Sequence, residues 1–135
     1  MVDRINSCED LEAWKAARDL VRFIYSVFRR KPASQDFGLK DQVQRAAVSA
    51  MTNIAEGFER VHFAEKLQFY NIARASCGEV RSLSYVILDA AYISDAEHKK
   101  ILELVAQAGR LVSGLIRSTR ARTATPNSHL PSPIS

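Results

Sequence analysis

The sequence predicts an all-α protein, an antiparallel, up-down-up-down four-helix bundle. Along four segments, apolar residues recur at steps of three or four, which is the pattern of a helix with one buried face. The 135 residues include only four prolines and five glycines, and no strand-like alternation occurs, which disfavours a turn-rich β fold. Short links between the segments favour neighbouring helices of opposite direction.

The first helix is predicted over residues 9–31. Ser7 and Asp10 have the spacing of a capping box at its start. Apolar residues follow at helical spacing, and a cationic turn then leads into Pro32, a residue that stops helices.

The second helix, predicted over residues 39–58, has two faces of different character. Gly57 is expected to break this helix or to cap its C-terminus. The apolar face consists of Val43, Ala47, Ala50, Ile54 and Phe58. The opposite, polar face consists of Arg45, Ser49, Asn53, Glu56 and Arg60. A polar face of this kind indicates a specific partner, either another part of the same chain or another molecule.

The third and fourth helices are predicted over residues 63–91 and 95–121. Ser94 and Glu97 form a second capping box before the fourth helix. That helix carries two adjacent apolar seams, so either it lies centrally in the core or one seam meets another subunit. One seam is Ile101, Leu104, Ala108, Leu111 and Leu115, and the other is Leu102, Val105, Gly109, Val112 and Ile116. The domain is expected to span residues 1–121, and the polar, proline-containing residues 122–135 are expected to be a disordered tail.

Composition indicates a cytoplasmic protein with a basic end. The apolar fraction of 47% is ordinary for a globular protein, and the net charge is +4. No signal peptide and no membrane-spanning run is recognisable. Cys8 and Cys77 lack a disulfide or zinc spacing and are expected to be reduced thiols. From Arg117 onward the chain has three arginines and no acid, which suits either a nucleic-acid contact or a solvated helix end.

No pattern in the chain indicates catalysis, a metal or a cofactor. The three histidines, His62, His98 and His129, are scattered, and each is expected to be exposed or at a boundary. No phosphate-binding glycine loop or nucleophile–base spacing occurs. We therefore expect a protein that is not an enzyme.

Polar residues on the third helix are the candidate partners of the polar face of the second. They are Arg74, Ser76 and Glu79. In an antiparallel bundle these helices are neighbours, so Glu79 is expected to meet Arg45, Asn53 or Arg60 and fix the register. The alternative is a polar patch that binds a ligand or partner.

These motifs together resemble the four-helix bundle family of the 23S rRNA intervening-sequence (S23-like) proteins. The resemblance runs from about Leu11 to Arg117, and Met51 stands where the family often has proline. It rests on Leu11-Glu12-Ala13-Trp14-Lys15-Ala16, Phe37-Gly38-Leu39 with Gln42, Arg45-Ala46-Ala47-Val48-Ser49, Asn53-Ile54-Ala55-Glu56-Gly57-Phe58 with Arg60, and Phe69-Tyr70-Asn71-Ile72-Ala73-Arg74 with Ser76 and Glu79.

The resemblance implies a ring-shaped homopentamer whose biochemical role is poorly defined. A distantly similar group, the accessory variability proteins of diversity-generating retroelements, is implied to bind nucleic acid and a reverse transcriptase. By that analogy the chain is an RNA- or DNA-associated accessory factor. A ring of five would carry five times the +4 charge of one chain and repeat its basic end around one face.

Two functional hypotheses follow. In the first, the protein binds phosphate backbones through Arg110, Arg117, Arg120 and Arg122. In the second, it is a protein–protein interaction scaffold without a nucleic-acid role, whose partner docks on the patch of Asn53, Glu56 and Arg60.

Overall fold

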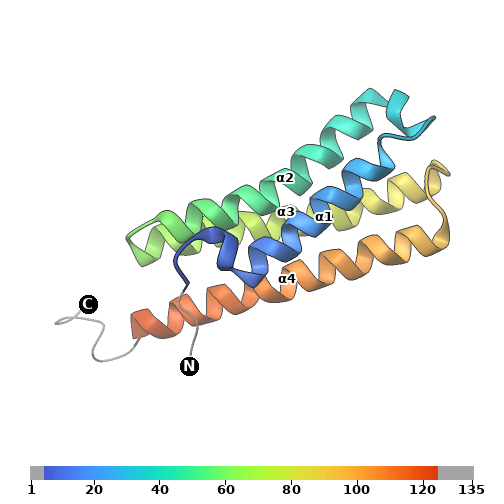
Figure 1. Ribbon diagram of the computed structural model, residues 1–135. Coiled ribbons are helices and arrows are strands. Elements are labelled where there is room, and N and C mark those ends of the chain that lie inside the picture. The colour runs from blue at the N-terminus through green and yellow to red at the C-terminus, as the bar shows by residue number, and fades with distance from the viewer. Residues whose placement is uncertain (1–4, 125–135) are drawn as a thin grey trace.

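The computed structural model describes residues 5–124, which form four long α-helices and two short 3-10 helices, without a strand in that range. The prediction of an all-α chain with four helices is confirmed. The long helices are α1 (Glu12–Val27), α2 (Phe37–Glu59), α3 (Phe63–Asp89) and α4 (Asp95–Ala124), and the short ones are η1 (Cys8–Asp10) and η2 (Ala33–Gln35) (Figure 1).

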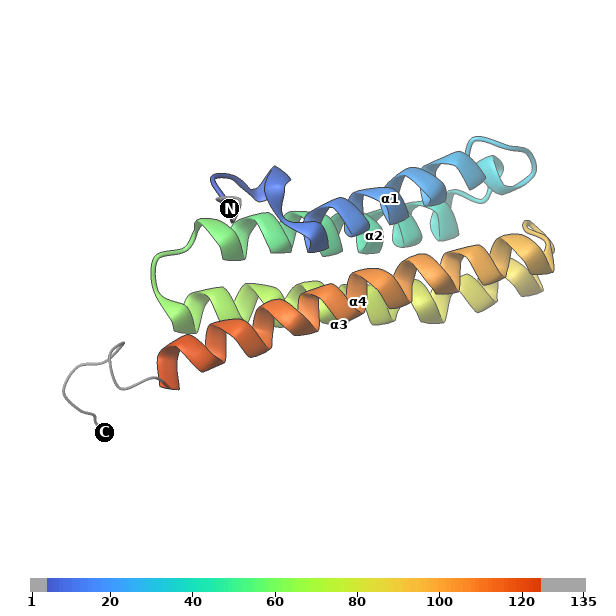
Figure 2. The same ribbon diagram turned by 60° about the horizontal axis from the view of Figure 1, so that its bottom comes forward.

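The four long helices pack side by side in an elongated bundle (Figures 1 and 2). Figures 1 and 2 show the α1–α2 and α3–α4 links at one end of the molecule and the α2–α3 link at the other. Helices α1 and α3 each pack against both α2 and α4. Helices α3 and α4 are therefore neighbours in the bundle, which positions the site described below.

The core consists of two clusters of buried aliphatic and alanine side chains. The larger cluster includes Leu20, Ile24, Val43 and Ile101, and the smaller one includes Ile54 and Val112. None of the apolar residues in the two seams of α4 is exposed. Five of these ten residues are buried and the other five are half-buried, namely Leu102, Leu104, Gly109, Leu111 and Leu115. Helix α4 packs against α1 and α3.

Helix α1 is shorter at both ends than predicted. The Asp10 carboxylate accepts the backbone N–H of Ser7 at 3.3 Å, but this cap closes η1, and extended backbone at Leu11 delays the long helix until Glu12. At the other end α1 stops at Val27 rather than at residue 31. There Arg30 donates to the backbone carbonyl of Tyr92 at 3.0 Å and pairs with Glu97, contacts that tie this link to the start of α4.

Helix α2 extends beyond its predicted bounds, because it begins at Phe37 and ends at Glu59. The Asp36 carboxylate accepts the backbone N–H of Leu39 at 3.2 Å and caps the start. Gly57 is inside the helix, so its prediction as a break or C-terminal cap is wrong. A Cβ atom at Gly57 would lie 2.5 Å from Cε1 of Tyr70, so glycine is needed for the close approach of α2 to that ring.

The boundary between α3 and α4 follows the sequence signals closely. Helix α3 ends at Asp89, and Ala91 turns the chain with a positive φ of 65°. The second capping box is confirmed: Ser94 N–H donates to the Glu97 carboxylate at 2.9 Å, and Glu97 N–H donates to Ser94 Oγ at 3.1 Å.

Helix α4 continues to Ala124. Residues 122–124 are therefore helical, and the prediction that they belong to a disordered tail is wrong. The rest of that predicted tail, residues 125–135, lies outside the described residues. Within residues 5–124, no helix combines the length and the hydropathy that a membrane span requires.

Candidate nucleic-acid interface

A groove between α3 and α4 collects four arginines. Arg74 and Arg81 come from α3, and Arg110 and Arg117 come from α4. Each pair is seven residues apart, which is about two helical turns, so each pair lies on one side of its helix. We call this the arginine groove. Its volume is about 590 Å³, and the rest of its lining is Cys77, Gly78, Val105, Ala106, Gly109 and Ser113.

The four guanidinium groups have no acidic partner in the described part of the chain. None of the ion pairs among residues 5–124 involves them, and no acid lines the groove. Arg74 donates to Asn71 Oδ1 at 3.0 Å, and Arg110 donates to Gln107 Oε1. These neutral acceptors orient the side chains but do not neutralise them, so the groove carries four positive charges that an external anion can balance.

The floor of the groove is made of small side chains. Cβ atoms built at Gly78 and Gly109 would meet nothing within 4 Å, so the floor is open to an approaching ligand. Cys77 is buried there, and burial raises the pKa of its thiol to about 11. The thiol is therefore protonated at neutral pH and is a poor nucleophile. The groove is equipped for binding anions.

The four arginines predicted from the sequence to contact phosphate do not all lie at one site. Arg110 and Arg117 line the groove, and Arg120 is exposed on α4, three residues beyond Arg117 on the same side of the helix. Arg122 lies elsewhere, with its guanidinium 5.1 Å from the ring centre of Phe63. Arg81 also lines the groove but was not predicted from the sequence. Its spacing of seven residues from Arg74 could have indicated that the two arginines share one side of α3.

The polar face of α2 forms short-range contacts. Ser49 Oγ and Ser76 Oγ are 2.8 Å apart and join α2 to α3. Asn53 Nδ2 donates to the backbone carbonyl of Ser49 at 2.9 Å and to its hydroxyl at 3.0 Å. This small network holds the two helices in register at a half-buried boundary.

The charged residues of that face pair within α2. Arg60 pairs with Glu56 at 2.9 Å, and its guanidinium lies 4.7 Å from the ring centre of Phe69. Arg45 pairs with Asp41 at 3.6 Å. The positive charges of both arginines are therefore balanced by carboxylates of α2 itself.

The expected contact of Glu79 with the polar face of α2 is wrong. Glu79 is exposed, and no hydrogen bond or ion pair joins it to another residue of the described chain. It directly precedes the buried Val80, and adjacent helical positions differ by about 100° in direction, so its side chain is turned out of the interface.

His98 differs from the expectation that each histidine is exposed or at a boundary, because it is buried. Its Nε2 atom lies 3.1 Å from Ser84 Oγ. Since Ser84 donates its proton to the backbone carbonyl of Arg81 at 2.6 Å, it accepts a hydrogen bond from the imidazole. The pair is a structural contact of α3 with α4 and not a nucleophile with its base. Within residues 5–124, no cluster of side chains suitable for a metal occurs.

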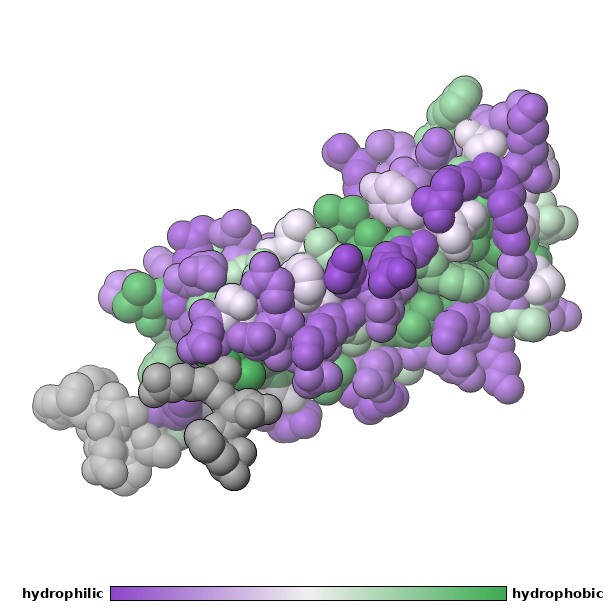
Figure 3. Space-filling model, in the orientation of Figure 1, coloured by the Kyte–Doolittle hydropathy of each residue, from purple (hydrophilic) through white to green (hydrophobic). Residues whose placement is uncertain are grey.

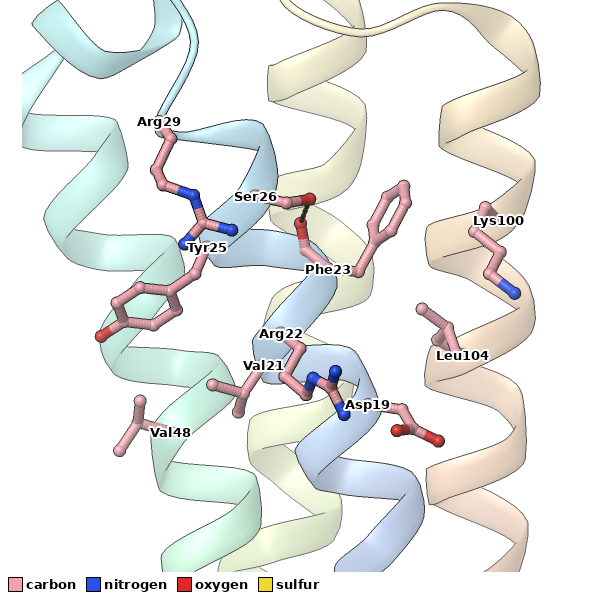
Figure 4. A pocket seen from close by; sticks show the side chains of 10 residues that line it. All are labelled: Asp19, Val21, Arg22, Phe23, Tyr25, Ser26, Arg29, Val48, Lys100 and Leu104. Carbon is pink, nitrogen blue, oxygen red and sulfur yellow. Dashed lines mark hydrogen bonds between the residues drawn. The ribbon is translucent and has the colours of Figure 1, made fainter.

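A hollow of about 850 Å³ lies over the outer face of α1. Figure 4 shows its side chains on both sides of α1, with Tyr25 and Val48 toward α2, and Phe23 and Leu104 toward α4. The same face is a mixture of apolar and hydrophilic surface (Figure 3). Its cations, Arg22, Arg29 and Lys100, share the hollow with the carboxylate of Asp19. The arginine groove, with four cations and no acid, is the stronger anion site.

The fold and the groove define an all-α protein with a cationic groove along its two longest helices. The family model of the 23S rRNA-intervening sequence protein matches residues 9–114. The match spans most of the chain, and the chain belongs to this family. It includes Arg74, Arg81 and Arg110 of the groove and ends before Arg117.

A solved structure has a similar fold. It is the crystal structure of a protein of unknown function from the S23 ribosomal protein family of Bacteroides thetaiotaomicron VPI-5482. The TM-score is 0.72 at 17% sequence identity, and the likeness covers 78% of this chain and 98% of that chain. At this identity the likeness establishes the fold alone. No curated protein matches the chain.

Proposed function

We propose that this protein is a non-catalytic, nucleic-acid-associated accessory factor that binds phosphate backbones in the arginine groove. The observation that carries the proposal is the group of four arginines, two from each helix, without a carboxylate partner among residues 5–124. Guanidinium groups suit phosphate because they donate two parallel hydrogen bonds to its oxygens.

The lining of the groove favours contact with the backbone over contact with bases. It contains no aromatic side chain on which an unpaired base would stack. Binding through phosphates alone has little sequence preference and weakens steeply as salt increases. RNA is the first ligand to test, since the family is named for an insert in 23S rRNA.

The subunit is further proposed to be an antiparallel, up-down-up-down bundle that assembles in the cytoplasm as a ring of five, with a reverse transcriptase or another protein as a further partner. Ile72 and Val86 on α3 are 41% and 47% exposed and are available to a second copy. Assembly would repeat the arginine groove and increase its avidity for a long ligand. Light scattering tests the ring, for which the expected mass is five times that of the chain.

The experiment compares two variants with the same change in charge. In the groove variant, all four groove arginines become glutamine. In the control variant, four exposed arginines on α1, the following link and α2 become glutamine, namely Arg18, Arg22, Arg29 and Arg45. Each variant loses four charges, and the control also removes Arg22 and Arg29 from the hollow over α1.

Affinity for a fluorescent RNA duplex is measured by anisotropy at low salt. We expect the groove variant to bind at least about a hundredfold more weakly, since each phosphate contact contributes to a salt-dependent affinity. The control variant should stay within about fivefold of the wild type. Equal losses in the two variants would show that net charge, and not the groove, determines binding.

A protein–protein interaction scaffold is the second candidate. The exposed Ile72 and Val86 favour it, because apolar side chains on a helix surface are common at protein contacts. A chain that fails to bind RNA or DNA at low salt, but recovers one protein that is lost with Ile72→Ser and Val86→Ser, would support this candidate.

A further inference from the structure

An exposed tyrosine lies one helical turn beyond the arginine groove on α3. Tyr85 follows Arg81 by four residues and Arg74 by eleven, so the three residues share one side of the helix. Aromatic side chains in helices point back toward the N-terminal end, so the Tyr85 ring lies over the turn that contains Arg81. Tyr85 is 45% exposed. The line of cations on α3 therefore ends at an aromatic ring that is open to solvent.

The Tyr85 ring packs against a buried residue of α4. The ring centres of Tyr85 and His98 are 4.5 Å apart, and the two ring planes are at 69°. His98 is buried, and its Nε2 atom lies 3.1 Å from Ser84 Oγ. Because burial and this hydrogen bond fix the imidazole, the Tyr85 ring has a rigid neighbour. A ring held in this way loses little conformational entropy when a flat ligand stacks on it.

The charges around Tyr85 change sign along α3. Arg81 lies one turn before Tyr85 and Asp89 lies one turn after it, and both are exposed. Glu103 is also exposed, on α4 seven residues before Arg110. Neither carboxylate has an ion-pair partner among residues 5–124. These acids repel further phosphates, so the part of a nucleotide that suits the Tyr85 surface is its uncharged base.

We propose that Tyr85 is a stacking site for an unpaired base at the end of the arginine groove. The inference rests on the proposed function and names its ligand more closely, as a duplex that ends in an unpaired segment. The groove itself has no aromatic lining, so bases beside it stay paired and stacking is confined to Tyr85.

The distance along α3 sets the length of the unpaired segment. Four helical residues separate Tyr85 from Arg81, which is a rise of about 6 Å. At about 3.4 Å for each nucleotide along a strand, about two nucleotides span this rise. Two unpaired nucleotides are therefore enough to place a base on the Tyr85 ring.

Three RNA duplexes of one sequence separate base stacking from phosphate contact. One is blunt, one ends in two unpaired adenosines, and one ends in two abasic nucleotides, which keep the phosphates and lack the bases. The unpaired nucleotides are placed at the 3′ end in one set and at the 5′ end in another. Anisotropy at low salt measures the affinity of the wild type for each duplex. In at least one set, we expect the adenosine end to bind about 5- to 100-fold more tightly than the abasic end, since this is the range for stacking one base on an aromatic side chain.

Two substitutions of Tyr85 and one matched control assign the preference to this ring. Tyr85→Ala removes the ring and should abolish the preference for the adenosine end, whereas Tyr85→Phe keeps the ring and should retain it. Tyr25 is 36% exposed and lies on α1 in the hollow that contains Arg22 and Arg29, so it is also an exposed ring near arginines. Tyr25→Ala should leave the preference unchanged. All three variants should bind the blunt duplex as the wild type does, because their arginine groove is intact.

The proposal is overturned if the wild type binds the adenosine and abasic ends equally in both sets, or if Tyr85→Ala retains the preference. It is also overturned if Tyr25→Ala abolishes the preference as fully as Tyr85→Ala does. Equal binding of all three duplexes would refute the stacking site and leave the arginine groove as the phosphate-binding surface. Failure of every duplex to bind would refute both the stacking site and the proposed function.

Discussion

The polar face of α2 and the arginine groove differ in how their charges are balanced. On α2, Arg45 pairs with Asp41 and Arg60 pairs with Glu56. In the groove, none of the arginines has a carboxylate partner within residues 5–124. The residues that identify the family most clearly are thus engaged in short-range contacts, while the unbalanced charge lies on another pair of helices. Unbalanced charge is the better indicator of where a ligand binds.

The comparison also separates stability from binding. The contacts of α2 fix the packing and register of two helices, so their loss should lower stability. The groove arginines are exposed, and within residues 5–124 no hydrogen bond joins their guanidinium groups to a buried residue, so their loss should affect ligand affinity and leave the fold intact. Each experiment below tests one side of this division, beginning with the largest expected effect on stability.

Gly57→Ala should lower the free energy of unfolding by about 1–3 kcal/mol, because the added methyl group overlaps the Tyr70 ring in a packed interface. Chemical denaturation measures the change. Gly78→Ala is the matched control, since that glycine is also helical and has open space around it. It should raise stability by about 0.5–1 kcal/mol. Equal effects of the two substitutions would contradict a packing role for Gly57.

Ser76→Ala should lower the free energy of unfolding by about 0.5–1.5 kcal/mol, because it removes the hydrogen bond that joins Ser76 to Ser49 across the α2–α3 boundary. Thermal and urea unfolding measure the loss. Ser82→Ala, at an exposed position of the same helix, should change stability by less than about 0.5 kcal/mol. A loss of the same size at Ser82 would mean that the cross-helix bond contributes nothing specific.

Arginines with and without a partner should differ in their response to acid. Hydrogen bonding from Arg30 lowers the pKa of Glu97 below its usual 4.5. The stability from this pair is therefore present above about pH 4.5 and is lost as pH falls through the lowered pKa.

Arg30→Gln should reduce this acid-induced loss, by less than about 1 kcal/mol since both side chains are partly exposed. Arg81→Gln in the groove should leave the acid profile unchanged. Unfolding curves from pH 7 to pH 3 measure both variants, and a change at Arg81 would reveal a carboxylate partner in solution.

The fold was largely predictable from the sequence because its signals are local. Ser94 and Glu97 cap α4 as their spacing indicates. Ser7 and Asp10 also have this spacing, but the backbone at Leu11 is extended, so their cap closes a short turn instead. Gly57 was misinterpreted because a glycine near a helix end suggests a cap, whereas its role depends on Tyr70, thirteen residues away in another helix.

The candidate site was only half predictable. Arg110 and Arg117 belong to the basic end of the chain, which composition revealed. Arg74 was interpreted as part of a polar network, and Arg81 was not considered. Which faces of α3 and α4 meet depends on the packing of the whole bundle, and that placement brings the two pairs together. Likewise, the position of Arg122 beside Lys66 and Tyr70 follows from the extension of α4 to Ala124.

The most direct test of the account is the salt dependence of RNA binding by the wild type and the groove variant. For a duplex, the slope of log K against log salt changes by about 0.9 for each phosphate neutralised. If each groove arginine contacts one phosphate, the slope of the groove variant should be shallower by about 3.6, while the control variant keeps the wild-type slope. Equal slopes for the wild type and the groove variant would contradict the assignment of the arginine groove as the phosphate-binding surface.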